Sequence, residues 1–256
     1  MITFTIKIAG KKIGITTLSE RTRLYCQDYL TSEQPDWSVT ISSEDIESEK
    51  ALVRRNSARK GTTPPPFTDQ YLEVIALYRK IAERMLRDDT LLFHGSVIAV
   101  DGEAYLFTAA SGTGKSTHTR LWRQIFGDRA VMVNDDKPLL TITKSGVTAS
   151  GTPWCGKHRL STNITVPLKA ICILERGQEN KIEPISASQA LPMLLQECHR
   201  PEAPDKLVRL LDLLDQMISK VALYRLQCNM EPEAAIVAYS GMGGKNCETE
   251  NWICKS

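Results

Sequence analysis

The chain has 256 residues, of which 42% are hydrophobic and 24% charged, so it can form one large globular domain, alone or with a small appendage. Its 32 basic and 30 acidic residues leave a formal net charge of only +2, too little for an overall field that attracts nucleic acid or a membrane surface. We therefore expect a soluble partner.

The first 60 residues are predicted to form a β-rich segment that packs on the core. Residues 2–18 alternate apolar and polar side chains around a turn at Gly10, which is typical of a β-hairpin with one buried face. A further short strand is predicted at residues 37–42.

Charge dominates residues 42–60, and basic residues, a glycine and three prolines follow one another in residues 54–67. Proline is excluded from helix interiors and central strands, so we predict a loop here. Its basic side chains either contact an anionic partner or only keep the loop solvated. They are Arg54, Arg55, Arg59 and Lys60.

Residues 61–240 are predicted to form the core of the protein. From Asp69 to residue 89, apolar side chains recur at helical spacing, which predicts an amphipathic helix. Residues 91–109 then predict two strands joined by a tight turn at Asp101 and Gly102. Because this hairpin leads directly into the next loop, we expect a sheet that is partly antiparallel.

Residues 108–117, T-A-A-S-G-T-G-K-S-T, come close to the phosphate-loop pattern G-x-x-x-x-G-K-[ST], with Ala109 in place of the first glycine. A helix is predicted from residue 116 to 126, and its N-terminus adds attraction for anions. A plain strand-to-helix turn is the alternative, but it requires neither the lysine nor the hydroxyls. The predicted nucleotide-binding residues are Ser111, Gly112, Thr113, Gly114, Lys115, Ser116 and Thr117.

The following strand, at residues 129–134, ends in Asp135 and Asp136. A crossover from the loop returns this strand to the same edge of the sheet, so the two carboxylates are expected beside the phosphates. They either form a turn or share a cation, for which magnesium is suited. In phosphoryl transfer one carboxylate orients the metal and another accepts the proton of the attacking hydroxyl.

The rest of the core supplies strands at 139–143, 147–150, 168–177, 181–186 and 221–228, and helices at 186–198, 205–220 and 231–241. The fold class is thus α/β, a mixed, partly antiparallel sheet with flanking helices. The loop at 151–163 carries an exposed Trp154 with Lys157, His158 and Arg159, which either cover a substrate or have no special role. His118 is expected to be an ordinary residue of a helix face. Residues 241–256 have little pattern and are predicted to form a flexible tail.

Seven cysteines are scattered without a C-x-x-C pair, which indicates reduced thiols and no zinc or dithiol motif. The N-terminus lacks the apolar core and cleavage site of a signal peptide, and no run of about 18 apolar residues occurs. We expect a cytoplasmic protein with no membrane partner. The oligomeric state is open, with a homo-oligomer among the alternatives.

The run HGSVIAVDGEAYLFTAASGTGKST, followed by VNDDKP, resembles the HPr kinase and ATP-dependent phosphoenolpyruvate carboxykinase group. That group has S-G-x-G-K-[ST] in its loop and an Asp-Asp pair one helix and one strand later. The resemblance implies a P-loop kinase core with ATP and Mg²⁺ as cofactors. It further implies a functional histidine at His94, catalytic roles for Lys115 and Asp135, and a magnesium site at Ser116 and Asp136. The assignment of base and metal ligand between the two aspartates stays open.

The sequence departs from that group in Ala109 and in the absence of segments that would form a carboxykinase substrate site or grip the HPr carrier protein. The resemblance therefore implies a kinase that transfers the γ-phosphoryl group of ATP to a hydroxyl acceptor. The acceptor is left open between serine of a small protein or precursor peptide and a small metabolite. The alternative is a nucleotide-binding regulatory module with weak hydrolysis, which needs magnesium but no second carboxylate.

Overall fold

The computed structural model describes residues 1–156 and 158–244. The residues from 245 to 256, which make up most of the predicted tail, lie outside this described part. The N-terminal part of the chain forms a four-stranded sheet with the strand order β3-β1-β2-β4. Its strands are β1 (Ile2–Ile8), β2 (Lys11–Thr17), β3 (Leu30–Thr31) and β4 (Trp37–Thr40), with the short helices α1 (Glu20–Tyr25) and η1 (Gln27–Tyr29) between β2 and β3.

The predicted N-terminal hairpin is confirmed, because β1 and β2 pair antiparallel through a turn at Ala9 and Gly10. One apolar face of this sheet packs on α3 (Asp69–Met85), which is the amphipathic helix expected there. Leu92 and Leu139 of the main sheet join the same buried cluster. The division of the chain at residues 60 and 240 stays a prediction.

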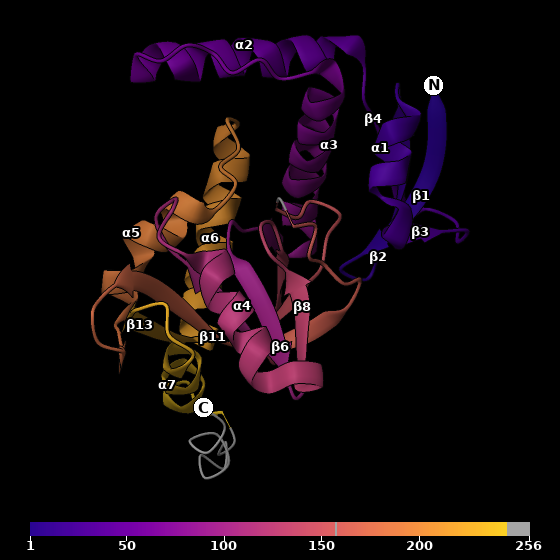
Figure 1. The fold of residues 1–256 in the computed structure, drawn as a ribbon. Helices are drawn as coiled ribbons and strands as arrows, with labels where there is room; N and C mark the ends of the chain where they lie inside the picture. The colour runs from indigo at the N-terminus through magenta and orange to yellow at the C-terminus, as the bar shows by residue number, and fades with distance from the viewer. Residues whose placement is uncertain (157, 245–256) are drawn as a thin grey trace.

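The loop predicted for the charged and proline-rich residues 42–67 is wrong up to residue 60, since the chain there forms the helix α2 (Ser43–Lys60), which lies across the top of the molecule in Figure 1, and only the residues after Gly61 lack regular structure. Asp45 accepts a hydrogen bond from the backbone of Ser42 at 2.8 Å, as in a capping box, and Gly61 ends the helix in a left-handed conformation. Between these caps the charged residues are good helix formers. The three prolines begin only after Gly61.

The main sheet has nine strands, and its mixed, partly antiparallel character is confirmed. Strands β7, β11 and β13 run parallel, whereas β6 pairs antiparallel with both β7 and β8. The order is β5-β9-β10-β11-β7-β6-β8, with β13 added on β11 and β12 on β13. The strands are β5 (Thr90–Leu92), β6 (Ser96–Val100), β7 (Glu103–Thr108), β8 (Ala130–Asn134), β9 (Leu139–Thr143), β10 (Gly146–Ser150), β11 (Thr165–Arg176), β12 (Lys181–Pro184) and β13 (Ala222–Cys228).

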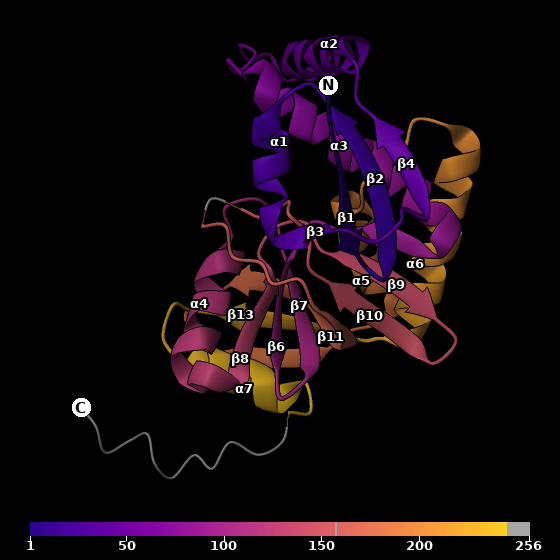
Figure 2. The same ribbon diagram turned by 90° about the vertical axis from the view of Figure 1, so that its right-hand side faces the viewer.

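Helices cover both faces of this sheet, as Figure 2 shows for α4 and α6. Along β7, Tyr105 and Phe107 point to one buried cluster and Ala104 and Leu106 to the other, because successive side chains alternate across a strand. The first cluster includes α4 (Lys115–Phe126) and α7 (Glu233–Gly241), and the second α5 (Ala187–Glu197) and α6 (Pro204–Lys220). Short 3₁₀ turns, η2 (Leu86–Asp88) and η3 (Gly127–Arg129), follow α3 and α4.

His118, which was expected on a helix face, lies on the face of α4 that is buried in this core. The side chain is buried and its Nε2 accepts a hydrogen bond from the indole Nε1 of Trp122 at 3.0 Å. The neighbouring ring of Phe107 lies edge-on, with ring centroids 4.6 Å apart. Burial lowers the pKa of His118 to about 4, because an imidazolium here would lose its hydration.

This depressed pKa predicts a specific loss of stability in acid. The unfolded chain takes up the proton near pH 6.5, whereas folded His118 takes it up only near pH 4, so stability falls as the pH drops below 6.5. The linkage between protonation and folding predicts that the free energy of unfolding falls by about 2 kcal/mol between pH 7.5 and pH 5. Urea unfolding at both pH values should show this loss in the wild type and a smaller one in His118→Gln. Equal losses in both proteins would contradict the assignment.

Candidate active site

The glycine-rich loop lies between β7 and α4, as the sequence predicts. It turns through Gly112 (φ 80°) and Gly114 (φ 125°), conformations that side chains with a Cβ rarely adopt. Ala109, which replaces the first glycine of the pattern, has a negative φ and is buried, so this substitution strains nothing. Ser111, Gly112 and Ser116 are exposed, and the loop is open to a ligand from solvent.

Lys115 is half-buried and folds back over its own loop, where its Nζ donates to the carbonyl of Ala109 at 3.0 Å. Burial lowers the pKa of Lys115, and the carboxylates of Glu197 and Asp136 oppose this shift. The loop is also held from β11, because Arg176 donates to the carbonyl of Gly112 at 2.7 Å. The ammonium group of Lys115 and the N-terminus of α4 therefore both lie at the glycine-rich loop.

Asp135 and Asp136 follow β8 directly and contact different groups. Asp135 is buried, and its Oδ1 accepts a hydrogen bond from the backbone of Gly156 at 2.6 Å. Asp136 lies 3.2 Å from the Nε2 of His94 through Oδ1, and its Oδ2 accepts from Lys137 at 3.1 Å. The two carboxylates thus have separate environments, as alternation at a strand end leads one to expect.

The environments move the two pKa values in opposite directions. Burial raises the pKa of Asp135, and the hydrogen bond from Gly156 only partly offsets this. Burial also acts to raise the pKa of Asp136, but the hydrogen bond from His94 and the charge of Lys137 outweigh it, so the net shift is downward. Asp136 is therefore held ionised, whereas Asp135 can exchange a proton closer to neutral pH.

His94 precedes β6 and connects this pair to a residue that the sequence analysis missed. Its Nδ1 lies 2.5 Å from Oε2 of Glu197, the last residue of α5, which is almost fully buried. The backbone of His94 also donates to the carbonyl of Glu197 at 2.8 Å. A carboxylate at a helix C-terminus opposes the helix dipole, and this unfavourable placement is the signal that could have marked Glu197.

Trp154 is buried at 2% exposure, so its prediction as an exposed residue is wrong. It packs in the cluster beneath the N-terminal sheet, 6.0 Å from Tyr78 between ring centroids. At Gly151 the loop packs closely on its own far end and on β8, where an added Cβ would lie 1.9 Å from the carbonyl oxygen of Thr162 and 2.7 Å from that of Val133. The loop instead offers the amide of Gly156 and the side chain of His158 to the region of Asp135. Lys157 lies outside the described residues.

A cavity of about 310 Å³ lies beside Asp135, between the first half of α4 and the loop after β10. Ser116 and Asp135 line the same cavity, which joins the glycine-rich loop to the acidic pair. Its other lining residues are Thr117, Thr119, Arg120, Arg123, His158 and Leu160.

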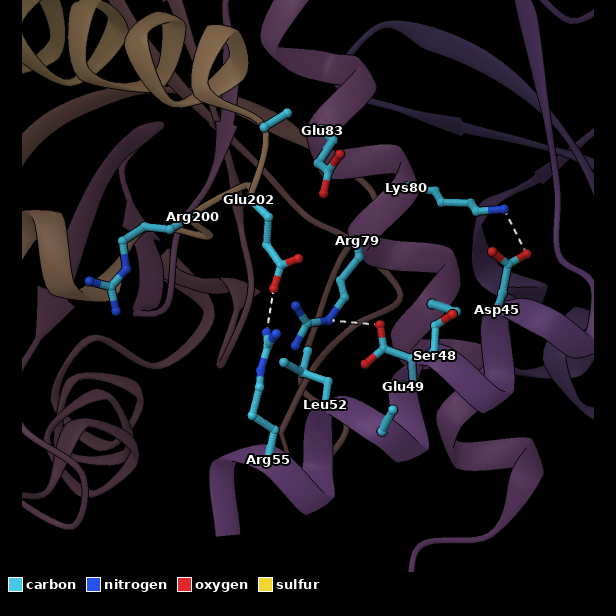
Figure 3. Close-up of a pocket in the computed structure, with 13 residues that line it drawn as sticks. Asp45, Ser48, Glu49, Leu52, Arg55, Arg79, Lys80, Glu83, Arg200 and Glu202 are labelled. Atoms are coloured by element: carbon cyan, nitrogen blue, oxygen red, sulfur yellow. Dashed lines mark hydrogen bonds and ion pairs between the residues drawn. The ribbon is translucent and has the colours of Figure 1, made fainter. Parts of the chain in front are cut away.

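A second hollow, of about 640 Å³, lies elsewhere, between α2, α3 and the segment that joins α5 to α6 (Figure 3). Its charged side chains face one another: Asp45 pairs with Lys80, Glu49 with Arg79, and Arg55 with Glu202. No residue of the glycine-rich loop or of the acidic pair lines it. We therefore place the candidate site at the smaller cavity, where the reactive groups are.

The fold and the site define a mixed α/β protein with a glycine-rich strand–loop–helix unit beside two aspartates. The family model described as SynChlorMet cassette protein ScmC matches residues 66–233, and the chain belongs to this family. A search of the curated proteins found no match.

Among solved structures, the Hpr(Ser) kinase/phosphatase from Coxiella burnetii is similar with a TM-score of 0.35 and 9% identity, over 59% of this chain and 95% of that one. Among the described residues, no helix is both long and apolar enough to span a membrane.

Proposed function

We propose that the protein is an ATP-dependent kinase of the P-loop type that transfers the γ-phosphoryl group to a hydroxyl acceptor. The observation that carries this proposal is the cavity that Ser116, the residue directly after Lys115, shares with Asp135. A hydroxyl placed there would meet the terminal phosphate from one side and a carboxylate from the other.

In this proposal the residues 111–117 hold the phosphates of ATP, and Lys115 neutralises charge on the transferred group. Magnesium, when bound, would neutralise negative charge on the terminal phosphates. Ser116 and Asp136 would hold it. This fits a cation that uses one or two carboxylates plus phosphate oxygens, and the described residues contain no ready cluster of three or more acidic, His or Cys ligands. Asp135 takes the proton of the attacking hydroxyl, and His94 with Glu197 fixes Asp136.

The second candidate is a regulatory module that binds nucleotide and hydrolyses it weakly. The exposed glycine-rich loop by itself is compatible with either function, the kinase or the regulatory module. The second carboxylate favours the kinase, because Asp135 lines the cavity beside Ser116, whereas a regulatory module needs magnesium but no general base.

The test combines calorimetry with a transfer assay. We expect the wild type to bind ATP with a dissociation constant of about 1 µM to 1 mM in the presence of magnesium, and more weakly without it. Label from γ-labelled ATP should appear on a protein or small molecule of a cell extract. Slow release of free phosphate without transfer would support the regulatory module, and failure to bind nucleotide would reject both functions.

A further inference from the structure

The cavity beside Asp135 carries more positive charge than the transfer step requires. The two guanidinium groups of Arg120 and Arg123 line it, against the single carboxylate of Asp135. Arg120 and Arg123 follow Ser116 by four and seven residues on α4, so all three side chains share one face of the helix.

The two arginines have no acidic partner. Neither makes an ion pair or a side-chain hydrogen bond with any residue in the described part of the chain, and the Nε of Arg123 is buried without a hydrogen-bond partner. A buried guanidinium N–H without an acceptor is costly, because the group has lost its water. Asp135 lines the same cavity, but within the described residues it makes no ion pair or hydrogen bond with either arginine.

A guanidinium presents its N–H donors in a planar fork that matches the oxygens of a carboxylate or a phosphate. Along a helix that rises about 1.5 Å per residue, Arg123 lies roughly 10 Å beyond Ser116. A ligand that met Arg123 would therefore extend along α4 beyond Ser116, away from the loop that would hold the phosphates.

We propose that the cavity binds an oxyanion, carboxylate or phosphate, carried by the acceptor itself close to its reactive hydroxyl. This inference rests on the proposed kinase function and narrows its substrate class. Arg123 and Arg120 hold the oxyanion and thereby direct the hydroxyl to Asp135. The hydroxyl oxygen then forms a bond to the γ-phosphorus as its proton passes to Asp135. The bond to the bridging oxygen breaks, and ADP leaves.

The test uses inorganic phosphate as the probe, on the full chain with its nucleotide site filled by magnesium and a non-hydrolysable ATP analogue. Equilibrium dialysis with labelled phosphate is carried out on the wild type, Arg123→Gln and Arg123→Lys. The matched control is Arg59→Gln, at an exposed position of α2. Thermal unfolding confirms that each variant is folded.

We expect one phosphate per chain in the wild type and the control, and binding weaker by about 10- to 100-fold in Arg123→Gln, the range for a lost charged hydrogen bond. Arg123→Lys should fall between them, because it keeps the charge but not the fork. Kinase assays with two kinds of substrate then distinguish a carboxylate from a phosphate as the oxyanion. The first is a peptide that ends in serine, with its C-terminus either free or amidated, and the second is a phosphorylated hydroxy acid.

Equal phosphate binding by the wild type and Arg123→Gln would overturn the inference, as would no binding by a wild type that binds the nucleotide analogue. If the analogue itself fails to bind, the proposed kinase function is wrong. The phosphate titration of the nucleotide-free protein still tests the cavity in that case, since the dependence on Arg123 does not involve the nucleotide.

Discussion

Replacing Lys115 by alanine should lower phosphoryl transfer by about 10²- to 10³-fold, the range seen when one preorganised donor to a developing charge is removed. The lysine is held at the loop by the carbonyl of Ala109, so its position is set before a nucleotide arrives. The loss should appear in kcat more than in KM, because charge on the transferred group is greatest in the transition state.

The matched control is Lys144→Ala, since Lys144 is an exposed residue at the turn between β9 and β10. Steady-state transfer from labelled ATP is measured for both variants, together with their thermal unfolding. Normal turnover by a folded Lys115→Ala protein would mean that residues 111–117 are only a strand-to-helix turn.

The elements that the sequence predicted well are those whose signal is local. The hairpin of β6 and β7 follows from the turn dipeptide Asp101-Gly102, and both residues are found at positive φ in the structure. The helix α4 ends at Gly127 as expected. The helix α2 is not predicted because its residues are mostly polar and show no apolar stripe. The prolines that follow it also favour a loop for the whole stretch, although they begin only after the helix has ended.

The parts of the site that could not be predicted come from distant segments. Glu197 meets His94 across 103 residues of sequence, and Arg176 meets the glycine-rich loop across 64. Such contacts depend on the order of strands in the sheet, which no local pattern encodes. Trp154 was misplaced for the same reason, since the N-terminal sheet that buries it lies far away in the sequence.

The two aspartates should fail in different ways when each is changed to asparagine. The raised pKa of Asp135 suits a general base, and Asp135→Asn should lose about 10²- to 10⁴-fold in transfer while it still binds magnesium and ATP. Asp136, whose pKa is lowered by His94 and Lys137 against the effect of burial, suits a metal ligand. Asp136→Asn should require more magnesium and recover part of its activity at high concentration.

The pH profile separates the same two roles. Because the general base must be deprotonated, transfer by the wild type should rise with pH up to a value set by the raised pKa of Asp135, above the ordinary 3.8 of an aspartate. This rise should vanish in Asp135→Asn and persist in Asp136→Asn. Asp128→Asn, at an exposed site after α4, is the matched control. Ser116 lines the same cavity as Asp135, so Asp135 would be the metal ligand if Asp135→Asn, and not Asp136→Asn, required more magnesium. If both variants transferred phosphate at the wild-type rate, the two aspartates would form only a structural turn.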